Sequence, residues 1–123
     1  MTVWKKCRMD SFYYDRAAII LDCEVRIDDS SIVVTYKTEE GWINYSGRNV
    51  GTGHFELKCD VYAGHASLHM FLESVFLEGY WVENGEKGMW RIELEHEWLD
   101  QDFGAQESRS VTILLKLARS AMK

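Results

Sequence analysis

A glycine-containing segment, residues 45–54, carries the side chains best suited to binding chemistry. Gly47, Gly51 and Gly53 would allow backbone N–H groups to approach an anion, and Arg48 could hold a phosphate through paired hydrogen bonds. The spacing matches neither the P-loop, which requires Gly-Lys-Ser/Thr, nor the dinucleotide-binding fingerprint. The segment therefore predicts either an anion-binding loop or a glycine-rich bend that eases barrel closure.

Five large aromatic residues fall on consecutive expected strands: Trp42, Tyr45, Tyr80, Trp81 and Trp90. Strand alternation turns Trp81 and Trp90 inward, which favours core packing over a base-stacking platform. A ring exposed at a barrel mouth would still stack on a flat ligand. We expect a ligand to bind near Arg48, with stacking by Trp42 and Tyr45. The full set of expected ligand-binding residues is Trp42, Tyr45, Arg48, Asn49 and His54.

The histidines and acidic residues offer two further kinds of chemistry. His65 and His69 share a strand face, and either Cys59 or His96 could add a third zinc ligand, but nothing in the spacing requires it. We expect surface histidines, with no metal and no cofactor. The carboxylates of residues 93–102 could transfer protons, yet they are also typical of a solvated strand edge. Since no nucleophile elbow is present, no catalytic residue is assigned.

Alternation of apolar and polar residues predicts strands that are covered on one face. The clearest example is residues 17–27, followed by a turn at 28–31 and a returning strand at 32–37. Further strands are expected at 42–46, 54–61, 66–73, 75–83 and 89–95, with a hairpin loop at 84–88. Such regular spacing predicts a mainly β fold, in which a small antiparallel meander closes into a barrel or rolled sheet.

Residues 108–122 differ from the rest because apolar side chains recur there at helical spacing. Ser108 or Ser110 could cap such a helix, whereas the β-branched run 111–113 favours a last strand instead. We expect a C-terminal helix over 108–122 packed on the barrel. The whole chain, 1–123, is then a single domain.

The composition limits which binding partners and which cellular compartment we expect for this protein. The 123 residues carry a net charge of −6 and no Lys/Arg cluster, which argues against nonspecific binding to nucleic acid. No apolar run approaches the ~18 residues that a membrane span needs, and the N-terminus lacks a signal-peptide pattern. The three cysteines have no CxxC spacing, which is typical of reduced thiols. We therefore expect a soluble cytoplasmic protein.

The strand pattern of residues 77–94 carries a resemblance to known barrels. A strand reading Leu-x-Gly-x-Trp meets a Gly-x-Trp-x-Ile-x-Leu strand across a tight turn, and residues 53–57 read Gly-His-Phe-Glu-Leu. These stretches resemble the cyclic-oligonucleotide-sensing β-barrel domain of membrane-anchored bacterial antiphage effectors, and also calycin-type ligand-binding barrels. The antiphage family carries N-terminal transmembrane helices, and this sequence shows none. The resemblance therefore implies ligand binding in antiphage defence, without the membrane disruption that transmembrane helices would provide.

Three hypotheses of function follow. The first is a noncatalytic barrel that binds a small ligand, such as a nucleotide or another anion. The second is a protein–protein interaction module, meaning an inhibitor, an immunity-type factor, an assembly subunit or a homodimer, which an exposed aromatic patch would favour. The third is a small enzyme that uses His54 or His69 with a nearby carboxylate in a cleft.

Overall fold

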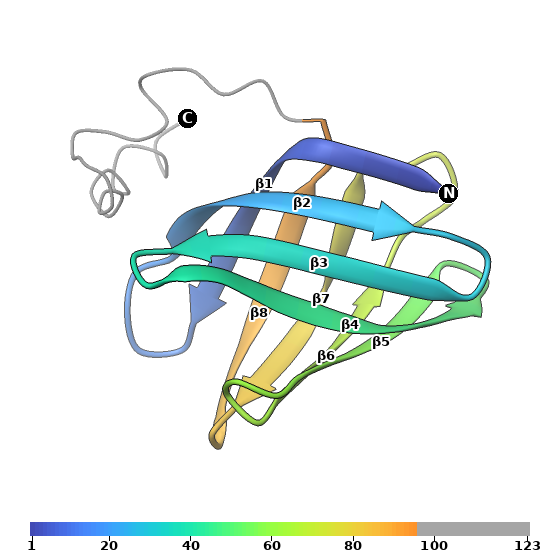
Figure 1. Ribbon diagram of the computed structural model, residues 1–123. Helices are drawn as coiled ribbons and strands as arrows, with labels where there is room; N and C mark the ends of the chain where they lie inside the picture. The colour runs from blue at the N-terminus through green and yellow to red at the C-terminus, as the bar shows by residue number, and fades with distance from the viewer. Residues whose placement is uncertain (96–123) are drawn as a thin grey trace.

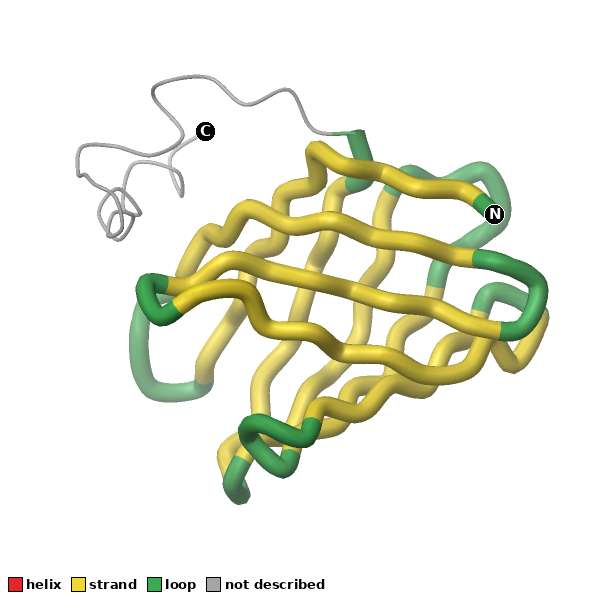
Figure 2. The backbone as a smooth tube through the Cα atoms, viewed as in Figure 1, coloured by secondary structure: helices red, strands yellow, loops and turns green. Residues whose placement is uncertain are grey.

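The computed structural model describes residues 1–95, which form a closed antiparallel β-barrel (Figure 1). The strands are β1 (Thr2–Tyr13), β2 (Ile19–Ile27), β3 (Ser31–Thr38), β4 (Gly41–Gly51), β5 (His54–Cys59), β6 (Gly64–His69), β7 (Phe76–Glu83) and β8 (Glu86–Glu93). Each strand pairs with the next one in the chain, and β1 pairs with β8 to close the ring, as the tube in Figure 2 shows. The meander predicted from the sequence is confirmed, and it takes the barrel form.

Two of the predicted hairpins have the expected chemistry. In the β2–β3 turn, Asp28 Oδ1 accepts hydrogen bonds from the backbone N–H of Ser30 at 3.0 Å and of Ser31 at 2.8 Å. In the β7–β8 turn, Asn84 and Gly85 have φ values of 49° and 84°. Positive φ at both central residues fits the two-residue hairpin for which Asn-Gly is preferred. This loop is shorter than predicted, because β8 begins at Glu86.

Three segments differ from the sequence prediction. The first strand, β1, was not predicted, because a register shift between Trp4 and Cys7 interrupts its alternation. The glycine segment, for which a loop or a bulged bend was expected, is strand rather than loop up to Gly51 and carries a bulge between Asn49 and Gly51. The strand expected to reach residue 73 ends at His69, and Leu72 is exposed in the connection that follows. The helix expected over 108–122 lies outside the described residues.

The inward-facing side chains form a single core. It is mostly aliphatic in the middle of the barrel, where Val25, Leu57 and Leu68 are fully buried or nearly so. The three cysteines, Cys7, Cys23 and Cys59, are also buried and free. Within residues 1–95, no helix has the length and apolarity needed to cross a membrane.

Alternate connections of a meander barrel lie at the same end, so the molecule has two distinct ends (Figure 1). One end carries the β1–β2, β3–β4, β5–β6 and β7–β8 connections, and we call it the Glu83 end. The other carries the β2–β3, β4–β5 and β6–β7 connections, and we call it the Asn49 end. The two ends present different chemistry.

Candidate functional site

A half-buried carboxylate lies inside the wall at the Glu83 end. Glu83 ends β7 on the same face as Trp81, because strand residues two apart point the same way. The Tyr36 hydroxyl donates to Glu83 Oε2 at 3.4 Å, and the Tyr45 hydroxyl donates to the same oxygen in a short contact. Two phenols from neighbouring strands therefore converge on one oxygen of a single acid.

Aromatic rings surround this acid. The Trp90 ring packs edge-on against Tyr45, with centroids 4.9 Å apart, and against Tyr36 at 5.8 Å. Tyr13 packs edge-on against Trp81 at 5.4 Å. Such T-shaped pairs set the positive edge of one ring against the negative face of another. The rings come from five different strands, so barrel closure is what assembles them.

The tyrosines at this end remain protonated over an extended pH range. Burial raises the pKa of both Tyr36 and Tyr45 well above the ordinary value, and the nearby Glu83 charge adds to the effect. Burial also raises the pKa of Tyr62, and the charges of Glu40 and Glu83 contribute. The phenols therefore act as hydrogen-bond donors in a locally acidic setting.

The Trp81 indole has an unsatisfied donor. Its side chain is only 2% exposed, and no acceptor in the described part of the chain contacts its Nε1–H. The indole lies against Gly88, where a Cβ would overlap ring atoms Cε2 and Cζ2. Leaving such a buried donor unpaired costs about 1–3 kcal/mol. An unpaired buried donor of this kind is a natural partner for an acceptor on a ligand.

Arg16 covers the outer side of this cluster. Its guanidinium carbon lies 4.2 Å from the centroid of the Tyr13 ring, a cation–π contact. Its Nη2 contacts Glu86 Oε2 at 2.5 Å, and its Nη1 contacts Asp15 Oδ1 at 2.8 Å. A cation is therefore already held at the Glu83 end by one aromatic face and two carboxylates.

The residues predicted to stack on a ligand lie on opposite faces of β4. Tyr45 is fully buried inside, whereas Trp42 is 48% exposed on the outer wall. The odd spacing between them explains the separation, because strand side chains alternate. Of the five predicted residues, Tyr45 alone belongs to the Glu83 cluster.

The other three predicted residues lie towards the Asn49 end. Arg48 is exposed on the outer wall, in register with Glu56 of β5. Asn49 faces inward, and its side-chain amide donates to the Asp28 carbonyl at 2.9 Å while its Oδ1 accepts from the Gly51 N–H at 3.0 Å. Asn49 thereby ties the β4 bulge to the β2–β3 turn, which is a structural role.

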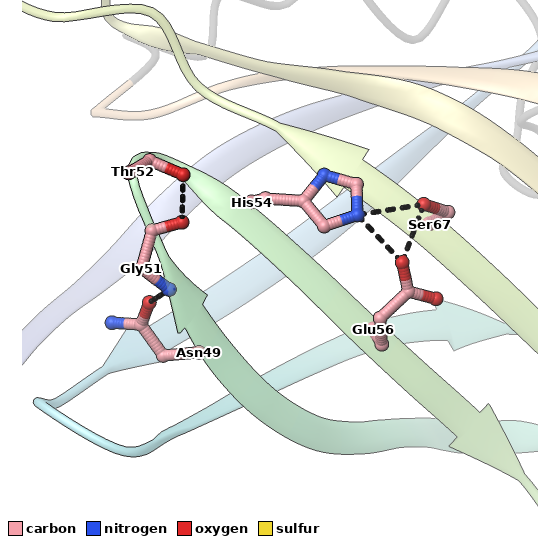
Figure 3. A network of polar contacts seen from close by, with 6 residues as sticks. All are labelled: Asn49, Gly51, Thr52, His54, Glu56 and Ser67. Atoms are coloured by element: carbon pink, nitrogen blue, oxygen red, sulfur yellow. Dashed lines mark hydrogen bonds and ion pairs between the residues drawn. The ribbon is translucent and has the colours of Figure 1, made fainter.

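His54 belongs to a polar network on the outer wall (Figure 3). Its Nε2 lies 2.6 Å from Glu56 Oε2, and the Ser67 hydroxyl donates to the same oxygen at 2.9 Å. Partial desolvation raises the Glu56 pKa, but the bonds from Ser67 and His54 outweigh it, so the net pKa is lowered. The Ser67 hydroxyl also lies 3.4 Å from the same His54 Nε2. One ring nitrogen therefore faces both the serine and the acid, whereas a nucleophilic triad uses the two ring nitrogens separately.

The remaining histidines do not gather into a metal centre. The His69 ring lies 6.3 Å from that of His54 and packs edge-on against Phe71 at 4.6 Å. His65 packs edge-on against Tyr80, and Cys59 is buried inside the wall. Among residues 1–95, no group of three or more metal-ligating side chains is present. His96 lies outside that range.

An apolar row crosses the outer wall on β1, β8 and β7. Phe12 is in register with Met89, and Met89 with Tyr80. All three are exposed by roughly two-fifths to one-half of their surface. This row was not singled out from the sequence, because Phe12 lies in the strand that the alternation failed to predict.

Sequence reasoning missed the main feature of the site, although a signal for it exists. Trp81 was expected to face inward, and the same alternation turns Glu83 inward, two residues later and at the strand end. An acid on the inward face beside a hairpin turn marks the barrel end. Comparison with protein-family models, with curated proteins and with solved structures finds no match for this chain, so the fold and this geometry carry the functional argument.

Proposed function

We propose that this chain is a noncatalytic barrel that binds one small ligand at its Glu83 end. The observation that carries the proposal is the buried indole N–H of Trp81, which has no acceptor among the described residues. An eight-stranded barrel encloses an interior that side chains fill or that holds one small ligand. A ligand acceptor bonded to Trp81 would remove the cost of the unpaired donor.

The surrounding side chains define how a ligand would be held. Tyr36, Tyr45 and Trp90 offer aromatic edges and faces for a flat or apolar body. Glu83 offers a carboxylate oxygen, Oε1, outside its bonds from the two phenols. Entry requires movement of Tyr13, which packs on Trp81 and is only partly buried. A nucleotide or another anion, the expectation from Arg48, would instead bind towards the outer wall.

A thermal-shift screen of small molecules tests the proposal. A ligand at a hundred times its dissociation constant adds about 2.7 kcal/mol of stability, which raises the melting temperature of a domain this size by roughly 5–15 °C. The screen includes amines, neutral aromatics, nucleotides, fatty acids and divalent metals. A flat result across all classes at millimolar concentration would reject small-ligand binding.

Two tryptophan variants locate the site. Trp81→Phe removes the unpaired donor and should weaken a hit about tenfold, the effect of losing one good hydrogen bond. Trp42→Phe makes the same change on the outer wall and should leave affinity unaltered. Arg48→Gln tests the anion alternative, because loss of nucleotide binding in that variant alone would move the site to the outer wall.

A protein–protein module is the second candidate, supported by the exposed apolar row of Phe12, Met89 and Tyr80. Contiguous apolar surface of this kind is typical of contacts with another chain or a second copy. Sedimentation velocity from micromolar to millimolar concentration tests the homodimer. Met89→Glu should dissociate such a dimer, and a wild-type monomer throughout that range would count against it.

A further inference from the structure

We propose that the ligand of the Glu83 end is an organic cation: an ammonium or guanidinium group attached to a flat, largely apolar body that carries one hydrogen-bond acceptor. This inference rests on the proposed function and specifies its ligand class. A half-buried carboxylate, surrounding aromatic rings and an acidic rim favour the positive charge. The Trp81 N–H, which lacks an acceptor in the described chain, calls for the acceptor on the ligand body.

The charges at this end favour a cation. The four connections there, residues 14–18, 39–40, 60–63 and 84–85, carry the carboxylates of Asp15, Glu39, Glu40 and Asp60, and Arg16 is their one basic residue. Glu83 and Glu86 flank the last of these connections. Lys37, Lys58 and Lys87 lie nearby but occupy exposed positions of the wall. A rim whose connections carry more acidic than basic side chains raises the local concentration of cations.

The carboxylate is poised to pair with a ligand. Tyr36 and Tyr45 both donate to Oε2 of Glu83, which fixes the orientation of the group. A positive group on the ligand would donate to Glu83 Oε1. Such a charge-assisted hydrogen bond is stronger than a neutral one. An anion at the same place would be repelled by Glu83. The aromatic rings would add cation–π attraction in a partly desolvated setting.

The Arg16 guanidinium is a cation that this end already binds, through an aromatic ring and carboxylates. It lies over the Tyr13 ring at 4.2 Å and contacts Glu86 at 2.5 Å. Tyr13 also packs against Trp81, so the arginine stands directly outside the proposed site. A ligand cation entering past Tyr13 would compete with Arg16 for the same ring and the same acidic rim. Arg16 is thus expected to weaken ligand binding and to exclude weaker cations.

Three near-isosteric probes, each with a ring hydroxyl as the acceptor for Trp81, test the charge preference: 4-hydroxyphenethylammonium, 4-hydroxyphenethyl alcohol and 4-hydroxyphenylacetate. Isothermal titration calorimetry at low ionic strength measures each with the full chain. We expect the cation to bind at least tenfold more tightly than the alcohol, and the anion more weakly than either. Equal binding of cation and alcohol would overturn the inference while leaving the proposed function standing. If none of the three binds at millimolar concentration, the inference is overturned, and the thermal-shift screen across all classes decides the proposed function.

Glu83→Gln is the decisive variant, and Glu78→Gln is its matched control. Both lie on β7 and remove one negative charge, but Glu78 is exposed on the outer wall, where it pairs with Arg91 at 3.1 Å. The first change should reduce the cation-to-alcohol ratio to about one, and the second should leave it unchanged. An equal fall in both variants would mean that net charge alone governs binding, which would overturn the inference.

Arg16→Ala supplies a test that does not disturb the interior, because Arg16 is exposed. Removing its guanidinium frees the Tyr13 ring and makes the rim more acidic. We expect 4-hydroxyphenethylammonium to bind several-fold more tightly, with no change for 4-hydroxyphenethyl alcohol. Unchanged or weaker cation binding would place the cation elsewhere and overturn the inference, even if Glu83→Gln failed to fold.

Discussion

Two regions of this barrel contain the same chemical group in different settings. At the Glu83 end, an acid inside the wall accepts hydrogen bonds from Tyr36 and Tyr45 among buried rings. On the outer wall, Glu56 accepts from Ser67 and lies beside His54, with the His54 and Glu56 side chains both about two-fifths exposed. Water screens the second cluster more strongly than the first. Both clusters have an acid and its donors, so we expect burial to decide how much each cluster contributes to the free energy of unfolding.

The largest effect should come from removing a buried ring. Trp90→Ala deletes the ring that packs against both Tyr36 and Tyr45, and should lower the free energy of unfolding by about 3–5 kcal/mol. Tyr80→Ala removes a half-exposed ring from the outer wall and should cost about 1 kcal/mol or less. Urea unfolding followed by circular dichroism measures both. Comparable losses would show that the outer row is covered in solution.

Deleting one hydroxyl from each acid cluster should give the next largest difference. Tyr45→Phe leaves Glu83 without its close donor and should cost about 2 kcal/mol, as for hydrogen bonds to charged groups. Ser67→Ala removes the donor to Glu56 and should cost about 0.5 kcal/mol or less. The same urea titrations apply. If the serine variant proves as costly, solvent screening is not what distinguishes the two sites.

The two clusters should also respond to opposite ends of the pH scale. The pKa values of Tyr36 and Tyr45 are raised above the ordinary 10.0, so the unfolded chain loses protons first as pH rises. The free energy of unfolding should therefore be unaffected below about pH 9 and fall above pH 10, by up to about 1.4 kcal/mol per pH unit for each tyrosine. Tyr45→Phe should make this alkaline fall shallower. An unchanged alkaline slope in that variant would contradict the assignment.

On the acid side, the pKa of Glu56 is lowered from 4.5, so its contribution is present above that value and lost as pH falls. Because Glu56 is more than a third exposed, screening reduces this contribution to about 0.5 kcal/mol or less. Glu56→Gln should therefore change the acid limb of the stability curve only slightly. A large change would show that this network is shielded from solvent.

The smallest expected effect is the reaction of the buried cysteine thiols with a reagent in the native protein. Cys7, Cys23 and Cys59 are all buried, and burial raises the pKa of Cys23. Hence a thiol reagent such as dithionitrobenzoate should label none of them in the native protein within minutes and all three in urea. Ser67→Cys adds a thiol on the outer wall, where one equivalent should react at once. Rapid native labelling of Cys59, which ends β5 at the Glu83 end, would show that this end opens.

Much of the fold was predictable because strand alternation and turn chemistry are local. The β2–β3 hairpin and the Asn84-Gly85 turn follow from short stretches of sequence, and Trp81 and Trp90 face inward as predicted. The first strand escaped prediction because its register shift after Trp4 breaks the period of two. The glycine segment was ambiguous because glycine allows both a loop and a bulged strand.

The candidate site was predictable only in part. Tyr45, predicted to stack on a ligand, lies in a buried aromatic cluster, but its expected partner Trp42 lies on the opposite face of the wall, and Arg48 lies on the outside. Residues close in sequence alternate between the two faces of one strand, so a contiguous segment cannot form one interior site. The partners of Tyr45 come instead from distant strands, as Glu83 of β7 and Trp90 of β8 show.

By itself, the sequence determined a β meander, its principal hairpins and the inward direction of its largest rings, because these depend on a period of two and on turn residues. The tertiary structure alone decided that β1 and β8 pair, which rings meet at the Glu83 end, and that the Trp81 N–H lacks an acceptor among residues 1–95. Closure joins residues far apart in the chain, and its register depends on the stagger of all eight strands together. No local pattern encodes that stagger.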